Sequence, residues 1–228
     1  MTTPKSEPKP VPSSTRAVDR ALALLAIVAD HGPISLTEAA REANLSISTA
    51  MRLLRTLESW HFVSRNGDAH YEVGRRMVEI GAQAISQERL YELSGQVLTD
   101  LTAETQETSY LGVPASDGMV IYLKQVESPR SIRHVGWVGR KVPIEGTSIG
   151  VALSGKTPPE GYASNPAQSD DAVAFTAPVI VSGEIVGALS VLVPRFRLTD
   201  ADGERVGYTV KRHADRLSDL LMGRSSTN

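Results

Sequence analysis

Three runs of apolar residues with helical spacing occupy the first part of the chain. The first predicts a helix over residues 15–29, which a Gly-Pro pair ends. The second starts at Ser35, which forms a Ser-x-x-Glu pattern with Glu38. In that pattern each side chain satisfies a free backbone N–H of the other, so a helix is predicted to about residue 43. The third predicts a helix over residues 47–60, with leucines on one face and serine, threonine and arginine on another.

Two short runs typical of β-strands follow the third helix. They cover residues 62–65 and 70–73 and are joined by Asn66-Gly67-Asp68, where Asn-Gly accepts positive φ at little cost. Three helices followed by a hairpin predict a winged helix-turn-helix domain over residues 14–74. A further helical pattern from residue 77 to about residue 86 predicts a linker helix, assigned to residues 75–88.

Residues 89–224 predict a second domain that mixes helices and strands. The predicted elements are a helix over 90–105, strands over 108–114, 119–126 and 132–138, a short helix over 147–153, a loop over 155–171, strands over 172–181 and 185–193, and a last helix over 200–222. The final two strands are nearly all apolar, which predicts a sheet covered on both faces. The fold class is therefore α+β, with a second domain of the small-molecule sensor kind.

Length and composition agree with two folded domains. The chain has 228 residues, of which 41% are apolar and 22% charged, as in ordinary globular proteins. It has no cysteine, which excludes disulfides, thiolate nucleophiles and cysteine-based metal sites. The longest apolar run, residues 21–29, is shorter than the ~20 residues of a membrane span, so no membrane partner is expected. Residues 1–13 are predicted to be a disordered arm rather than a signal peptide, and the protein is expected in the cytoplasm.

Charge is distributed unevenly along the chain. Residues 1–76 hold ten basic and eight acidic side chains, whereas the remainder holds fourteen basic and eighteen acidic ones. The sign of the net charge therefore changes near the predicted domain boundary. This difference slightly favours nucleic-acid binding by the first domain.

The predicted helix-turn-helix supplies candidate DNA-binding residues. Ser48, Thr49 and Arg52 are expected to face the major groove of double-stranded DNA, where an arginine pairs with guanine O6 and N7 and hydroxyls reach base edges or phosphates. Further candidates lie at the start of the third helix, later along it, at the start of the first helix and on the hairpin: Ser46, Arg55, Thr15, Arg16 and Arg65. The alternative is a winged helix used only for protein contacts.

The second domain carries no catalytic motif. It has neither Gly-x-Ser-x-Gly nor Gly-x-Gly-x-x-Gly, and the five histidines include no pair at metal-ligand spacing. No cofactor, metal or enzymatic activity is therefore expected, although an enzyme with a regulatory first domain is one alternative. His134 lies within a predicted apolar strand, where a lone imidazole either meets a core partner or lines a cavity.

Several ordered segments resemble one protein family, the IclR-type bacterial transcriptional regulators, over about residues 13–222. The resemblance is carried by residues 14–22 (STRAVDRAL), 48–58 (STAMRLLRTLE), 71–74 (YEVG), 122–128 (YLKQVES), 139–144 (GRKVPI), 177–179 (APV) and 187–191 (GALSV). It implies a winged helix-turn-helix joined to a GAF-like effector domain, in dimers that often form tetramers. It also implies control of operons, many of them catabolic, by small organic acids that include aromatic ones.

The resemblance also implies roles for individual residues. Ser48, Thr49 and Arg52 fall on DNA-reading positions of the family. The positions on or beside its effector cavity are His134, Ser148, Ile149, Ala174 and Ser190. The expected protein is thus a homodimeric or tetrameric regulator, a repressor bound to a near-palindromic operator. The alternative keeps DNA binding but makes the second domain a dimerisation module without a ligand.

Three departures from the family pattern bear on these roles. The short helix lacks a lysine that the family usually has after its glycine, here Gly150. Ile47 and Met51 stand where lysine and histidine are common, which removes possible phosphate contacts. The segment between Leu153 and Ala172 is much shorter than usual, so the pocket is expected to be more open, or to be closed by a partner subunit or by this Pro-rich loop.

Overall fold

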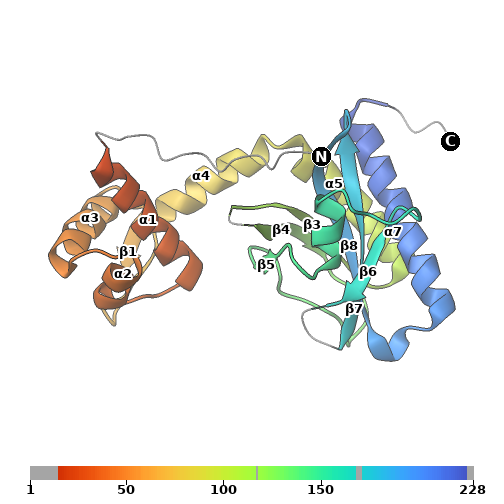
Figure 1. Ribbon diagram of the computed structural model, residues 1–228, viewed down its shortest axis with the longest axis horizontal. Helices are drawn as coiled ribbons and strands as arrows, with labels where there is room; N and C mark the ends of the chain where they lie inside the picture. Colours follow the sequence, from red (N-terminus) through yellow and green to blue (C-terminus); the bar gives the residue numbers. More distant parts are fainter. Residues whose placement is uncertain (1–14, 117, 168–170, 225–228) are drawn as a thin grey trace. The chain divides into compact units, whose positions relative to one another are not determined.

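The computed structural model of the chain describes residues 15–116, 118–167 and 171–224 (Figure 1). The arm predicted over residues 1–13 lies outside these ranges. The chain divides into two compact units between Ile85 and Ser86. No helix in the described ranges is long and apolar enough to cross a membrane.

The first unit contains three helices, a two-stranded hairpin and a fourth helix, as predicted. The elements are α1 (Arg16–His31), α2 (Leu36–Glu42), α3 (Ile47–Ser59), β1 (Val63–Arg65), β2 (Tyr71–Val73) and α4 (Arg75–Ser86). Leu24, Val28 and Leu54 are fully buried between the helices, and Tyr71 of the hairpin packs on them. Ile34 and Tyr71 also exchange backbone hydrogen bonds of 2.9 and 2.8 Å, which tie the hairpin to the segment before α2.

The predicted start of α2 is confirmed in detail. The Ser35 hydroxyl accepts a hydrogen bond from the Glu38 backbone N–H at 3.2 Å, and the Glu38 carboxylate accepts one from the Ser35 backbone N–H at 3.2 Å. Two of the N–H groups that a helix start leaves without a partner are thereby satisfied.

The hairpin is where it was predicted, but the reason given for its turn is wrong. The residue with positive φ is Ala69, at 61°, and not Gly67. The Asn66 side chain shapes the turn instead, because its Oδ1 accepts hydrogen bonds from the backbone N–H groups of Asp68 and His70, both at 3.0 Å. Asparagine therefore acts here by mimicking a backbone acceptor.

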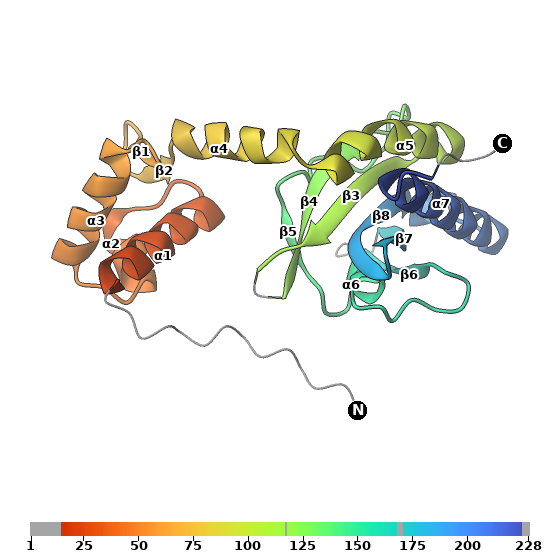
Figure 2. The ribbon, with the colours of Figure 1, turned by 90° about the horizontal axis from the view of Figure 1, so that it is seen from above.

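The second unit is a six-stranded antiparallel sheet with helices on both faces (Figures 1 and 2). Its elements are α5 (Arg89–Thr105), β3 (Thr108–Pro114), β4 (Met119–Val126), β5 (Lys141–Pro143), α6 (Ser148–Leu153), β6 (Ala163–Pro166), β7 (Ala172–Val181), β8 (Glu184–Pro194), the 3-10 turn η1 (Arg195–Arg197) and α7 (Asp200–Leu221). The strand order is β5-β4-β3-β8-β7-β6.

The sheet is covered on both faces, as its apolar strands predicted. Phe175 and Val191 pack with α5 and α7 on one face (Figure 2). Their neighbours Ala174 and Leu192 belong to a second buried cluster on the other face, together with Ile149 of α6. Successive residues of a strand point to opposite faces, so each strand contributes to both layers.

Two predictions of strand and loop were wrong. Residues 132–138 form no strand; they are irregular, and Gly136 has a φ of 82° that no regular strand contains. The strand in this region is β5, which pairs with β4. Residues 155–171 are not all loop, because β6 pairs with β7 at the edge of the sheet. The polar sequence of β6, which ends in Pro166, concealed it, and an edge strand tolerates proline.

Candidate functional site

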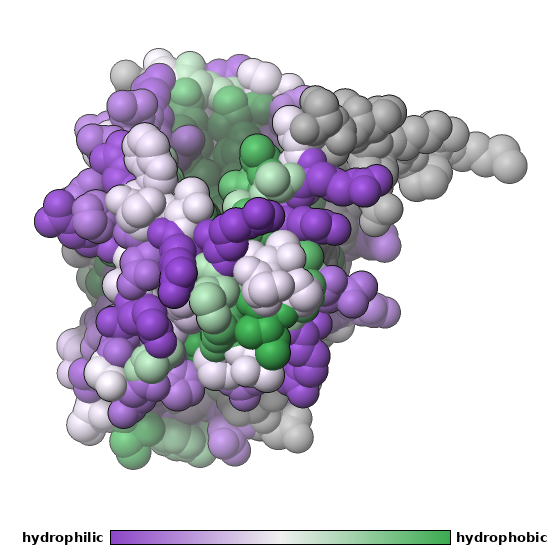
Figure 3. All heavy atoms as spheres, turned by 90° about the vertical axis from the view of Figure 1, so that its left-hand side faces the viewer, coloured by the Kyte–Doolittle hydropathy of each residue, from purple (hydrophilic) through white to green (hydrophobic). Residues whose placement is uncertain are grey.

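The exposed face of α3 collects the polar residues that were predicted to read DNA. Ala50 and Leu54 are fully buried on the inner face, whereas Ser48, Arg52 and Arg55 are exposed. Figure 3 views the molecule from the side of this unit and shows hydrophilic side chains interspersed with smaller apolar areas. The division of α3 into a packed and a polar face is therefore the one predicted.

A shallow hollow of about 760 Å³ runs along this face of α3. None of the residues that line it carries a carboxylate. They are Ile47, Ser48, Met51, Arg52, Arg55, Thr56 and Ser59. Within the described residues neither Arg52 nor Arg55 forms an ion pair. Both guanidinium groups are thus available to an outside acceptor, and an arginine fork suits guanine or phosphate.

Ser46 and Thr49 form the hydrogen bonds that cap the start of α3. Ser46 is the N-cap, and its hydroxyl accepts a hydrogen bond from the Thr49 backbone N–H at 3.3 Å. The Ser46 hydroxyl also lies 2.8 Å from the Thr49 hydroxyl and 3.2 Å from that of Ser48. The three hydroxyls form one cluster at the exposed end of the helix.

The other candidate DNA-binding residues lie outside α3. Thr15 and Arg16 are exposed at the start of α1, where the Thr15 side chain makes no capping hydrogen bond. The Arg65 guanidinium carbon lies 5.3 Å from the centre of the Tyr71 ring, and one of its N–H groups donates to the Ala69 carbonyl at 3.4 Å. Arg65 therefore braces the hairpin and remains exposed at its surface.

Three of the five candidate effector residues line one small cavity in the second unit. Ser148, Ile149 and Ala174 do so, with a cavity volume of about 20 Å³. The remaining lining residues are Tyr122, Trp137, Val142, Thr147, Pro166 and Ala167. Such a volume holds about one water molecule. Pro166 and Ala167, near the end of the shortened segment, form part of the cavity wall.

Ser190 joins the cavity wall through a chain of hydroxyl groups. The Ser148 hydroxyl lies 3.0 Å from that of Thr176, which lies 2.8 Å from that of Ser190. All three residues are buried. Burial raises the pKa of the neighbouring Tyr122 well above its usual value, although the Ser190 hydroxyl opposes this by hydrogen bonding. These groups are therefore neutral hydrogen-bonding groups at ordinary pH.

His134 lies beside the cavity wall and not in a strand. Its Nδ1 is 2.6 Å from the Tyr110 hydroxyl, and its ring meets Trp137 edge to face, with centres 4.4 Å apart. Burial, with the positive charge of Arg140, lowers the pKa of His134 to about 4, so the ring is neutral at pH 7.

Residues 128–140, here called the strap, cover the aromatic side of the cavity and are held at one end by Glu107. This buried carboxylate accepts hydrogen bonds from Nε and Nη2 of Arg197, both at 2.9 Å. The same Nη2 donates to the Ile132 carbonyl of the strap at 2.9 Å. The Thr108 hydroxyl donates to the His134 carbonyl at 2.7 Å. Side-chain hydrogen bonds thus hold the first part of the strap, and backbone hydrogen bonds of Gly139 and Arg140 with Tyr122 of β4 hold its last part.

Among the residues of this site that sequence reasoning missed are Tyr110, Tyr122, Trp137 and Thr176. Alternation along the predicted strands carried a signal for two of them, since Tyr110 and Tyr122 share the inner face with Val120. The close packing around position 150 explains why it is a glycine, because a Cβ there would lie 1.7 Å from the Ile144 carbonyl oxygen. In the described ranges no group of three or more His, Cys, Asp and Glu residues is placed to hold a metal.

Comparison with known proteins bears on both units. The model of the IclR helix-turn-helix domain matches residues 17–67, and the model described as bacterial transcriptional regulator IclR C-terminal matches residues 82–165. The acetate operon repressor of Salmonella typhimurium is 30% identical over 66% of this chain and 56% of its own length. The regulator KdgR of Dickeya chrysanthemi is 28% identical over 62% of this chain and 47% of its own. The chain thus spans about half the length of the curated relatives it matches.

Solved structures share the fold of the whole described chain. An IclR transcriptional regulator from Alicyclobacillus acidocaldarius has a TM-score of 0.77 and 24% identity, covering 90% of this chain and 98% of that one. An IclR homologue complexed with 4-hydroxybenzoate from Microbacterium hydrocarbonoxydans has a TM-score of 0.71 and 18% identity, covering 91% and 99%. The two family models together match more than half of the sequence. The chain belongs to the IclR family of bacterial transcriptional regulators, which are not enzymes.

Proposed function

We propose that the chain binds double-stranded DNA through α3 and represses a catabolic operon until a small organic effector binds the second unit. The observation that carries this proposal is the exposed face of α3, where Arg52 and Arg55 have no ion-pair partner among the described residues, opposite a fully buried inner face. The repressor role rests on relatives such as the acetate operon repressor. This function would be exercised in the cytoplasm, where bacterial DNA lies.

Each residue of the DNA surface takes a distinct part in the proposal. Arg52 reads a guanine, Ser48 and Thr49 offer hydroxyls to base edges or phosphates, and Arg55 contacts the backbone. Ser46 holds the start of α3. The remaining candidates, Thr15, Arg16 and Arg65, contact phosphates on either side of the groove.

A homodimer or tetramer fits this mode of binding. One α3 covers only a few base pairs, whereas two copies related by a two-fold axis reach successive major grooves about 34 Å apart. The operator is therefore expected to be nearly palindromic. Effector binding then acts by favouring one arrangement of the DNA-binding units over another.

The proposed effector is a small, aromatic, acid-like molecule at the cavity bounded by Ser148, Ile149 and Ala174, with His134 and Ser190 beside it. A solved relative that holds 4-hydroxybenzoate supports this class of ligand. The cavity of about 20 Å³ is far smaller than the ~150 Å³ that accommodates benzene, so binding requires the strap to move. The small volume favours the second candidate function, in which the second unit serves only for dimerisation and binds no effector.

Base recognition by Arg52 is tested by fluorescence anisotropy on the DNA upstream of the gene. Arg52→Ala should cost ~1–3 kcal/mol and relax preference at one base pair. Arg205→Ala, which removes an exposed arginine of the second unit, is the matched control and should bind as the unchanged protein does. Equal weakening on every sequence would contradict a base-reading role.

Effector binding by the second unit is tested by thermal unfolding in the presence of aromatic acids. A rise in melting temperature that is lost in His134→Ala indicates an effector domain, and no rise indicates a module that serves only for dimerisation.

A further inference from the structure

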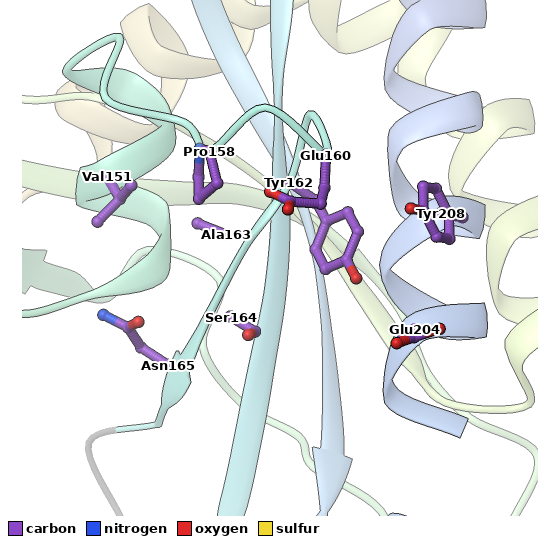
Figure 4. Close-up of a pocket in the computed structure, with 9 residues that line it drawn as sticks. All are labelled: Val151, Pro158, Glu160, Tyr162, Ala163, Ser164, Asn165, Glu204 and Tyr208. Atoms are coloured by element: carbon purple, nitrogen blue, oxygen red, sulfur yellow. The ribbon is translucent and has the colours of Figure 1, made fainter. Parts of the chain in front are cut away.

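A second, larger cleft lies at the β6 edge of the second unit. It has a volume of about 530 Å³ and is formed by α6, the segment before β6, β6 itself and α7 (Figure 4). Its lining residues are Val151, Pro158, Glu160, Tyr162, Ala163, Ser164, Asn165, Glu204 and Tyr208. None of them lines the small cavity beside Ser148. The cleft is thus a separate site, and its chemistry does not depend on the proposed function.

Two tyrosine rings form an aromatic corner in this cleft. Tyr162 and Tyr208 meet at 73° with ring centres 5.5 Å apart (Figure 4). The Tyr162 ring lies directly on the backbone of α7, because a Cβ at Gly207 would come within 2.2 Å of its Cε2 and Cζ atoms. Its position is therefore fixed by the helix, and only glycine at position 207 permits it. Tyr208 is 53% exposed and offers the rest of its ring to the cleft.

The charged groups of the cleft are all negative. Glu160 and Glu204 approach the aromatic corner from the two sides of the cleft (Figure 4). Neither carboxylate forms an ion pair in the part of the chain that the structure describes. The Lys211 side chain passes along Gly161 beside the cleft, and its ammonium group pairs with Asp215. Burial raises the pKa of the Tyr162 hydroxyl, and the charges of Glu204 and Glu160 act in the same direction.

Each feature of the cleft selects against a different kind of ligand. Carboxylates without a counter-charge repel anions, and the apolar rings give a hydrated metal ion little to bind. A cation with apolar substituents suits both the carboxylates and the rings, since its charge is attracted to the carboxylates and to the negative faces of the rings. We propose that this cleft binds a small organic ammonium ion, with Tyr162 and Tyr208 contacting its apolar groups and Glu160 and Glu204 balancing its charge.

The test is a calorimetric titration of the full chain with choline, and separately with putrescine, at physiological salt. The control ligand is the neutral isostere of choline in which carbon replaces the ammonium nitrogen. We expect saturable binding of at least one cation in the millimolar range or below, and binding of the neutral isostere weaker by about tenfold or more. No saturable binding of either cation, or equal binding of the isostere, overturns the proposal.

Two variants locate the binding. Glu204→Gln and Tyr208→Leu change exposed side chains, so both should fold, and each should weaken cation binding by about fivefold or more. Glu184→Gln removes an exposed carboxylate at the β7–β8 turn and should leave binding unchanged. If Glu204→Gln and Tyr208→Leu bind as well as Glu184→Gln does, the cation sits elsewhere and the assignment is wrong. DNA binding is not measured here, so failure of this test leaves the proposed function standing.

Discussion

The ion pair between Glu107 and Arg197 offers a quantitative test of how the strap is held. The Glu107 side chain is 4% exposed and that of Arg197 is 17% exposed, so removal of either charge leaves the other largely shielded from water. The two residues share two hydrogen bonds of 2.9 Å, and Arg197 donates a third, also of 2.9 Å, to Ile132 of the strap. Arg130 adds a contact of 3.3 Å, but it is 41% exposed.

The magnitude follows from burial. Breaking a buried, hydrogen-bonded ion pair by removing one partner costs ~3–5 kcal/mol, while an exposed contact such as that of Arg130 contributes ~0–1 kcal/mol. Because the Arg197 side chain is partly exposed to solvent, Glu107→Ala is expected to lower the free energy of unfolding by ~3 kcal/mol, the lower end of that range. Glu107→Gln keeps the shape and one acceptor, so a loss of ~2 kcal/mol is expected.

Urea unfolding followed by tryptophan fluorescence measures these losses. The chain has two tryptophans, Trp60 and Trp137, so Trp60→Phe leaves Trp137 of the strap as the only reporter. Glu79→Gln, in an exposed pair on α4, is the control and should change the unfolding free energy by less than ~0.5 kcal/mol. In a double-mutant cycle with Arg197→Met, a coupling energy below ~0.5 kcal/mol would refute the view that this pair anchors the strap.

Three further results are expected. Because the pKa of His134 is about 4 in the folded protein and 6.5 in the reference state, protons added between these values bind the unfolded chain, so the unfolding free energy should fall from near pH 7 to near pH 4. His134→Gln should flatten that dependence in urea titrations; an unchanged slope would contradict the assignment. Ser35→Ala should destabilise the first unit by ~1 kcal/mol in thermal unfolding, and no change would mean that the capping box is not formed in solution. Gly150→Ala should destabilise the second unit by ~3 kcal/mol or more, because the new Cβ meets the Ile144 carbonyl. The control Gly81→Ala, which has open space around it, should stabilise α4 by ~0.5–1 kcal/mol. Equal effects of the two substitutions on the unfolding free energy would contradict the close approach at Gly150.

The elements that the sequence predicted well are those specified by local chemistry. The capping box at Ser35 starts α2 at the predicted residue, and the β-rich composition and flanking turn residues of β3 and β4 predicted both strands with their observed bounds. Residues 132–138 of the strap were mistaken for a strand because they are rich in residues that favour β-structure and are bounded by turn residues. In the structure Val135 and Val138 are exposed while Trp137 is buried among aromatic rings, so the packing of Trp137 contributes to the path of the strap.

The candidate site was predictable only in part, for a related reason. Ser148, Ile149 and Ala174 were identified through resemblance to a family, and they do meet at one cavity. Thr176 joins Ser148 across 28 residues and Arg197 reaches Glu107 across 90, contacts that no local pattern encodes. The cleft at β6 likewise depends on α7 lying beside Tyr162, which the sequence did not indicate.

DNA binding by α3 is the central claim, and its salt dependence tests it most directly. The measurement is an anisotropy titration of the unchanged protein and of Arg55→Ala against the DNA upstream of the gene, with unrelated DNA as control, at two salt concentrations. We predict preference for the upstream DNA, affinity that falls steeply with salt, and a salt slope reduced by about one in Arg55→Ala. The same affinity for both DNAs, with no response to salt or to loss of Arg55, would contradict the account.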